Sequence, residues 1–411
     1  MTKTTFREFP VDNASILFLS LLRPYHTNNF RFSAVLGQPV RPEILQQAVN
    51  RIHPRFPSVI AGFRQDFFRY TQVAASQPPK VLPDPGLLTP MTPEELRTCA
   101  FRVYYQDCTI AIELFHALTD GSGAIAVLTA LVGEYLRLAL PGEVTPAPLG
   151  EPQEWEVADS YQELADVKPK RLPSRFSYLL PRPKDADWTV RGSDLTLPTA
   201  PLLTAAHRYG VTLNTLLAAL MASTVMEMQV NEKGAQDLKP VRLMVPINLR
   251  KMTGSRTLRN FSLYALPTLE PHQRDLPLSE LCKIMDAQLK EQLAPETQKA
   301  MASANVRSQN AWYCKYLPWK LKRIALQIGY RFFGESNSSL TLTNLGIVRL
   351  PPEIAPYVED FVCQMTPRVS SPYGCTILSF GDKITFNISR FCPTDELGEV
   401  FFRKIREICE E

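Results

Sequence analysis

Metal-binding, nucleic-acid-binding and membrane-spanning patterns are all missing from this chain of 411 residues. Its 8 cysteines include no pair with the CxxC spacing of a zinc or redox site, and its 5 histidines do not cluster with them. The formal net charge is only +4, and no long basic block occurs. No apolar run reaches the length of a membrane span. We therefore expect no metal site, no nucleic-acid partner and no transmembrane helix.

Several common catalytic motifs are also missing. The chain has no GxSxG segment, which marks many serine hydrolases, and no glycine loop of the P-loop or GxGxxG kind. Residues 1–10 are polar and do not look like a secretion signal. We therefore expect reduced cysteines and a cytoplasmic location.

Length and proline distribution predict two lobes. A chain of 411 residues is long for one core, and its 35 prolines gather in connecting segments. Residues 141–184 are proline-rich and mix both charges, and so long a connector is unusual inside one compact domain. We place the first lobe at 1–175 and the second at 176–411. Both lobes mix strand and helix patterns, which predicts an α/β (α+β) fold.

Individual elements follow from the spacing of apolar residues, which alternate in strands and recur every three to four residues in helices. Strands are expected at Asn29–Leu36, Phe101–Tyr105, Thr109–His116 and Val241–Asn248, with a hairpin of Cys375–Phe380 and Lys383–Ser389. Helices are expected from Pro42 and over Ala200–Tyr209, Leu213–Met228, Leu278–Leu293, Pro318–Phe333 and Asp395–Cys409.

One histidine stands where a strand pattern ends and a helix pattern begins. The alternating apolar residues of 110–114 place His116 on their face of the strand, and helical spacing follows from Ile125. Asp120 comes four residues later, in the turn. In one interpretation Asp120 caps the helix and His116 simply packs at the strand end, since such caps are common. In the other, His116 is a general base held in place with the help of Asp120.

Three motifs add a resemblance that favours the second interpretation. Residues 116–121 read HALTDG, residues 245–250 and 259–262 read VPINLR and RNFS, and residues 342–346 read LTNLG. In this order and spacing they resemble the CoA-dependent acyltransferase superfamily, whose shared motif is HxxxDG. That superfamily includes chloramphenicol acetyltransferase, alcohol acetyltransferases and the condensation domains of peptide synthetases. The resemblance extends over nearly the whole chain.

The resemblance implies both a fold and a mechanism. The fold would be two chloramphenicol-acetyltransferase-like lobes, each a mixed sheet covered by helices, with an active-site tunnel between them. The protein would transfer an acyl group from acyl-CoA, as co-substrate and without a bound cofactor, to an alcohol or amine. His116 would be the general base. Asp120 and Gly121 would be structural, and Arg250 is the candidate ionic partner of Asp120.

Three other candidate site residues each have two possible roles. Ser122 is either a helix cap or a donor near the reaction oxyanion. Asn260 and Asn344 either donate hydrogen bonds in the tunnel or serve turns. Condensation domains usually carry a second histidine before the catalytic one, where this chain has Phe115. This departure argues against a carrier-protein-linked condensation role. A carrier-protein-dependent or non-catalytic, condensation-like protein of lipid, polyketide or peptide biosynthesis is kept as the alternative, and we expect a monomer.

The helix expected at Pro318–Phe333 is basic as well as amphipathic. It could contact a membrane surface or the phosphates of coenzyme A. Alternatively, it is an ordinary surface helix whose lysines extend along apolar side chains.

Overall fold

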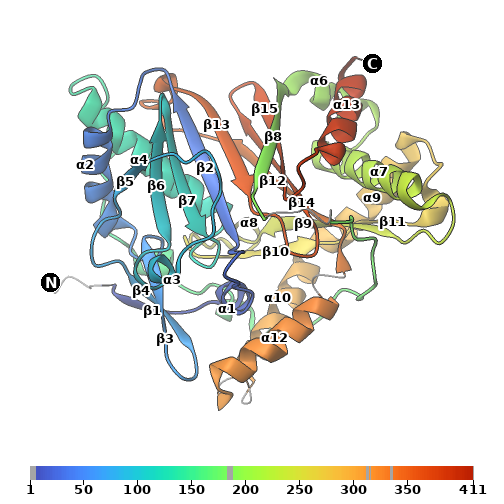
Figure 1. Cartoon of the computed structure of the whole chain (residues 1–411), viewed down its shortest axis with the longest axis horizontal. Coiled ribbons are helices and arrows are strands. Elements are labelled where there is room, and N and C mark those ends of the chain that lie inside the picture. Colours follow the sequence, from blue (N-terminus) through green and yellow to red (C-terminus); the bar gives the residue numbers. More distant parts are fainter. Residues whose placement is uncertain (1–5, 183–187, 312–313, 315, 334–336, 411) are drawn as a thin grey trace.

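A computed structural model shows two lobes side by side, each with its own mixed sheet and helices (Figure 1). It describes residues 6–182, 188–311, 314, 316–333 and 337–410. One large hydrophobic core lies mainly within the first part of the chain, and a second lies within the last part. This α/β architecture of two lobes agrees with the predicted fold class.

The first lobe is built on a five-stranded sheet in the order β13-β2-β7-β6-β5. Neighbouring strands are antiparallel except for β5 and β6. A smaller antiparallel sheet, in the order β1-β4-β3, lies beside it. The strands are β1 (Glu8–Pro10), β2 (Asn29–Leu36), β3 (Ala61–Gln65), β4 (Tyr70–Ala74), β5 (Val81–Pro83), β6 (Phe101–Gln106), β7 (Thr109–Phe115) and β13 (Val358–Met365). The helices are α1 (Asn13–Ser20), α2 (Pro42–Ile52), α3 (Pro93–Thr98), α4 (Gly121–Ala139) and the short α5 (Glu154–Val157).

The second lobe is built on a sheet in the order β10-β9-β12-β14-β15-β8, with β11 also paired to β9. Here β12 runs parallel to both β9 and β14, and the other pairs are antiparallel. The strands are β8 (Arg191–Pro198), β9 (Val241–Asn248), β10 (Ser262–Ala265), β11 (Thr268–Leu269), β12 (Leu340–Val348), β14 (Tyr373–Phe380) and β15 (Lys383–Arg390). The helices are α6 (Thr199–Arg208), α7 (Leu213–Lys233), α8 (Arg250–Thr253), α9 (Leu278–Leu293), α10 (Pro295–Asn310), α12 (Trp319–Phe333) and α13 (Glu396–Glu410).

The two parts of the chain share one strand. β13 comes late in the sequence, yet it pairs with β2 and completes the edge of the first sheet. In Figure 1 this red-orange strand lies against the blue strand β2. The first sheet therefore depends on residues on both sides of the predicted boundary, and the division at 175/176 remains a prediction.

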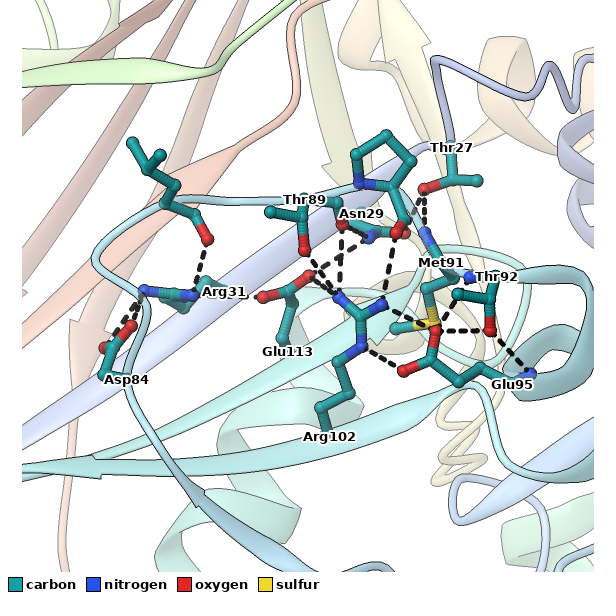
Figure 2. A network of polar contacts seen from close by, with 12 residues as sticks. Thr27, Asn29, Arg31, Asp84, Thr89, Met91, Thr92, Glu95, Arg102 and Glu113 are labelled. Atoms are coloured by element: carbon teal, nitrogen blue, oxygen red, sulfur yellow. Dashed lines mark hydrogen bonds and ion pairs between the residues drawn. The ribbon is translucent and has the colours of Figure 1, made fainter.

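A network of buried charges joins the central strands of the first sheet (Figure 2). Glu113 on β7 lies directly opposite Arg31 of β2 and Arg102 of β6, at 3.1 Å and 2.9 Å. The two arginines also bind Asp84 at 2.9 Å and Glu95 at 2.7 Å. Because each of these charges has an opposite partner, burial does not leave an isolated ion in the sheet. The network fixes β7, the strand that leads to His116.

Most of the predicted elements are present with similar bounds. The helix at Leu278–Leu293 and the strand at Asn29–Leu36 have the expected ends, and the helix capped by Thr212 extends further, to Lys233. The sequence interpretation overlooked α10 and β13. Many apolar residues of α10 are alanines, which give a weak amphipathic pattern, and the partner of β13 lies far away in sequence.

The expectation about membrane spans needs correction. Within the described residues, α4 and α7 have the length and hydropathy of a membrane-spanning helix. In these helices 56% and 67% of the apolar window is buried inside the protein. Core helices pass the same test, so the two helices are weak evidence for a membrane span.

Candidate active site

The turn at His116 follows directly from β7. The backbone N–H of His116 donates to the carbonyl of Asn28 at 2.8 Å, and the N–H of Leu118 closes the turn onto Phe115 at 2.9 Å. Helix α1 is bonded to the same turn, because Ser15 Oγ donates to the carbonyl of Ala117 at 2.6 Å. The position of the histidine is therefore set by a strand end, a turn and a neighbouring helix.

Two aromatic rings surround the imidazole of His116. Phe18 of α1 stacks on it with a centroid distance of 4.4 Å, and Phe30 of β2 lies at 4.7 Å. The residue as a whole is half-buried, and its Nδ1 is buried. Burial lowers the pKa of His116, and this effect outweighs the opposing influence of its own backbone, Asp120 and Asn260. The imidazole is therefore neutral at pH 7, the state that a general base requires.

Asp120 uses both oxygens of its carboxylate for structure. It is the N-cap residue of α4, and its Oδ1 accepts from the N–H groups of Ser122 at 3.1 Å and Gly123 at 3.3 Å. Its Oδ2 accepts from the N–H of Phe261 at 2.9 Å and lies 2.8 Å from Nη1 of Arg250. The ion pair with Arg250 is the one expected from the sequence, and it joins the turn to the second lobe.

Arg250 also holds the loop that faces this turn. Its Nε donates to the carbonyl of Thr257 at 2.8 Å, and its Nη2 donates to the carbonyl of Arg259 at 2.6 Å. From the other side, Thr119 Oγ1 donates to the carbonyl of Leu258 at 2.5 Å. Loop 254–261 and the HxxxDG turn therefore form one hydrogen-bonded unit.

Two glycines allow this close approach. A β-carbon on Gly121 would lie 2.5 Å from Cδ2 of Leu345, in the LTNLG segment. A β-carbon on Gly123 would lie 2.4 Å from the carbonyl oxygen of Leu258, which is backbone and has little room to move. A larger residue at Gly123 would therefore have to move backbone, so this glycine is a packing requirement, whereas at Gly121 only the end of the Leu345 side chain would have to move. The three resemblance motifs thus meet at the start of α4.

The remaining predicted residues occupy different places around the turn. The alternative that Ser122 caps the helix is wrong, because Asp120 is the cap; Ser122 Oγ instead accepts from Nδ2 of Asn248 at 2.8 Å. Asn260 is buried and donates from Nδ2 to the backbone carbonyl of His116 at 2.9 Å. Asn344 accepts from the N–H of Gly346 at 2.9 Å, as in turn chemistry. Neither asparagine contact identifies an oxyanion donor.

Three residues of the site were not identified from the sequence. Phe18, Phe30 and Ser15 all contact the HxxxDG turn. Phe30 belongs to an alternating strand pattern that gives its face but not its neighbour. Nothing in the sequence around Phe18 or Ser15 distinguishes α1 from any short apolar segment.

Neither a metal-binding cluster nor the groove described below coincides with the candidate site in the described part of the chain. The part of the chain that the structure describes holds no group of three or more His, Cys, Asp or Glu residues able to bind a metal ion. A groove of about 620 Å³ opens between α7, α9 and α13, and its lining includes none of the predicted site residues. The candidate site is therefore defined by the contacts of His116 and Asp120.

Comparison with known proteins identifies the fold. No family model and no curated protein sequence matches the chain. It superposes on polyketide synthase associated protein 5 from Mycobacterium tuberculosis with a TM-score of 0.64 at 13% identity, covering 97% of each chain. For trichothecene 15-O-acetyltransferase from Fusarium sporotrichioides the TM-score is 0.61 at 12% identity, covering 99% of this chain and 96% of that one. The first condensation domain of the calcium-dependent antibiotic synthetase gives 0.61 at 14% identity, with the same coverage.

The fold is one that acyltransferases and condensation domains share. The match covers both lobes of this acyltransferase and condensation-domain fold, so it is not confined to one shared motif. The structures similar to this chain include an acetyltransferase and a condensation domain. At these identities the likeness establishes the fold alone, and the activity has to be argued from the site.

Proposed function

We propose that this protein is an acyltransferase that moves an acyl group from acyl-CoA to the hydroxyl or amine of a small molecule. One observation carries the proposal: a half-buried imidazole stands at the end of β7, in a turn that bonds to both lobes. Burial lowers the pKa of this imidazole and keeps it neutral. Reactants that meet between the lobes would reach His116 without disturbing Asp120, whose two oxygens are already bonded.

The proposed reaction is a direct transfer with His116 as the general base. Because Nδ1 is buried, Nε2 is the nitrogen that we assign to the acceptor. Nε2 takes the proton of the acceptor hydroxyl or amine while the acceptor atom attacks the thioester carbon. The tetrahedral oxyanion then collapses, the carbon–sulfur bond breaks, and the imidazolium returns the proton to the thiolate. The chain ends the cycle with its histidine neutral, so no cofactor is consumed.

The oxyanion needs hydrogen-bond donors near the start of α4. The Ser122 hydroxyl is our first candidate, because its oxygen accepts from Asn248 and its own hydrogen is not used in that bond. It also stands at the N-terminus of a 19-residue helix, whose dipole favours negative charge. Ser122→Ala should therefore lower kcat more than it raises KM.

A carrier-protein-dependent condensation activity is the second candidate. It is supported by the condensation domain among the similar structures. The residue before His116 argues against it, because the Phe115 side chain is fully buried and packs edge-on against Phe63 at 5.7 Å. A second histidine at this position would lie in the core of the first lobe. We therefore propose acyl-CoA as the donor. We also propose that the protein is a monomer located in the cytoplasm.

The test is thiol release from acyl-CoA in a screen of alcohols and amines. His116→Ala should lose the release that depends on acceptor, while His207→Ala, which changes an exposed histidine on α6, should retain it. Full activity of His116→Ala would refute the mechanism. Calorimetry that shows no binding of coenzyme A would support a carrier-bound donor or a non-catalytic protein instead.

A further inference from the structure

Helix α12 is attached to the molecule along one side. Arg323 donates from Nε to the carbonyl of Ser20 at 3.2 Å and from Nη2 to the carbonyl of Leu22 at 2.7 Å. Gln327 adds a bond to the Ser20 carbonyl at 2.8 Å. These contacts place the helix against the end of α1. They also determine which side of α12 faces away from the protein.

The outward side of α12 is apolar. Leu321, Ile324 and Ile328 are 53%, 54% and 55% exposed. Their spacing of three and four residues places them in one stripe on the helix. Single exposed apolar residues are ordinary on a protein surface, but an aligned row on a helix that packs elsewhere indicates a binding surface.

A hairpin tip extends this stripe. Phe67 and Phe68, between β3 and β4, are 70% and 45% exposed, and their rings meet edge to face at 4.9 Å. The Phe67 carbonyl accepts from the N–H of Trp319 at 2.9 Å, and the Phe68 carbonyl accepts from Nζ of Lys322 at 3.2 Å. In Figure 1 the orange α12 lies on the outside of the molecule. We call the five side chains Phe67, Phe68, Leu321, Ile324 and Ile328 the apolar ridge.

Positive charge surrounds the apolar ridge. Helix α12 carries four basic residues and no acidic one, and two of the four, Lys320 and Arg331, are exposed. On the hairpin, Arg69 lies 3.6 Å from Asp66, so these two charges offset each other. The other two bond to the protein, Lys322 to the Phe68 carbonyl and Arg323 to the carbonyls of Ser20 and Leu22. Beside the apolar ridge, α12 thus exposes two cations and no acidic side chain.

We propose that the apolar ridge docks this protein on the surface of an anionic lipid bilayer. A helix with an apolar stripe and a basic remainder lies in the membrane interface, where apolar side chains enter the acyl boundary and cations meet the headgroups. The two aromatic rings of the hairpin enter the same layer beside the helix. A second copy of the chain is a poorer occupant, because two such faces would each bring the exposed cations Lys320 and Arg331, which repel like charges.

The docking surface adjoins the candidate active site. α1, against which α12 is held, also supplies Phe18, the ring that stacks on His116. A docked protein would therefore present its site close to the bilayer, which suits an acceptor or acyl donor that partitions into lipid. This consequence rests on the proposed function, but the docking itself does not.

The experiment is co-sedimentation of the full chain with vesicles of phosphatidylcholine alone and of equal parts phosphatidylcholine and phosphatidylglycerol. The protein should bind the anionic vesicles and bind the neutral ones more weakly. Leu321→Ser, Ile324→Ser and Ile328→Ser together should weaken binding at least about ten-fold through lost apolar burial. Lys320→Glu should weaken binding about five-fold or more on anionic vesicles, because each nearby cation contributes about that factor.

Matched controls separate docking from misfolding. Leu203→Ser and Leu276→Ser change leucines that are 42% and 39% exposed outside the apolar ridge, and together they should leave vesicle binding unchanged. All variants should keep the wild-type melting temperature within a few degrees. The proposal is overturned if the wild type ignores anionic vesicles, or if the triple variant binds them as the wild type does. It is equally overturned if sedimentation equilibrium shows a dimer that the triple variant abolishes, since the apolar ridge would then join two copies.

Discussion

Replacing Asp120 by alanine tests the claim that this residue is structural. The change removes a helix cap, which costs about 1–2 kcal/mol. It also leaves Arg250 without its carboxylate partner, and the two side chains are only 8% and 12% exposed. Removing one member of a buried pair costs about 3–5 kcal/mol. Because the two effects overlap in one carboxylate, we expect Asp120→Ala to lower the free energy of unfolding by about 3–5 kcal/mol in total.

Urea unfolding, followed by circular dichroism, measures this loss. Thr212→Ala is the matched control, because Thr212 caps α7 by accepting from the N–H of Thr215 at 3.2 Å and is not an ionic group. It should cost about 1 kcal/mol. Adding Arg250→Met to Asp120→Ala should recover part of the loss, since the stranded charge is then gone. The argument from a buried ion pair is wrong if Asp120→Ala costs no more than Thr212→Ala. It is also wrong if the losses of Asp120→Ala and Arg250→Met, measured separately, simply add in the double variant.

The remaining predictions concern packing, the buried network and proton transfer. Gly121→Ala should lower the melting temperature, and Leu345→Ala in the same chain should restore much of it; Gly123→Ala, which meets backbone, should have no such single-residue rescue. Glu113→Ala should cost about 1–3 kcal/mol in urea unfolding, because Arg31 and Arg102 each lose a buried partner but keep Asp84 and Glu95. On the acid side of the pH profile, kcat/KM should fall as His116 becomes protonated. The apparent pKa of this acid limb should lie below the usual histidine pKa of about 6.5. Phe18→Ala should admit water and move that limb to higher pH; an unmoved limb would disprove the role of burial.

Strong local periodicity made much of the fold predictable. The helix at Leu278–Leu293 and the strand at Asn29–Leu36 show the spacing of their type and have the predicted ends. Helix α10 was overlooked because many of its apolar residues are alanines, which define a face poorly. Strand β13 was overlooked because its stability comes from pairing with β2, and local sequence does not encode a distant partner.

The candidate site was predictable to the extent that it lies in motifs. The pair of Asp120 and Arg250 came from the resemblance, since 130 residues separate them and no spacing rule connects them. Phe18 and Phe30 determine the environment of His116, but apolar residues are frequent and only the fold shows which of them meet the imidazole. The sequence thus identified the polar residues of the candidate site better than the apolar residues around them.

The late position of β13 in the sequence has a consequence for how this protein folds during its synthesis. Until Val358–Met365 is synthesised, β2 has an open edge with unpaired backbone groups. Such an edge can pair with other chains, which is a route to aggregation. At about 5–20 residues per second, the first sheet waits roughly 12–50 s after its other strands have been synthesised. A nascent chain in this state is a natural client for chaperones, and a fragment ending near residue 175 should remain in it permanently.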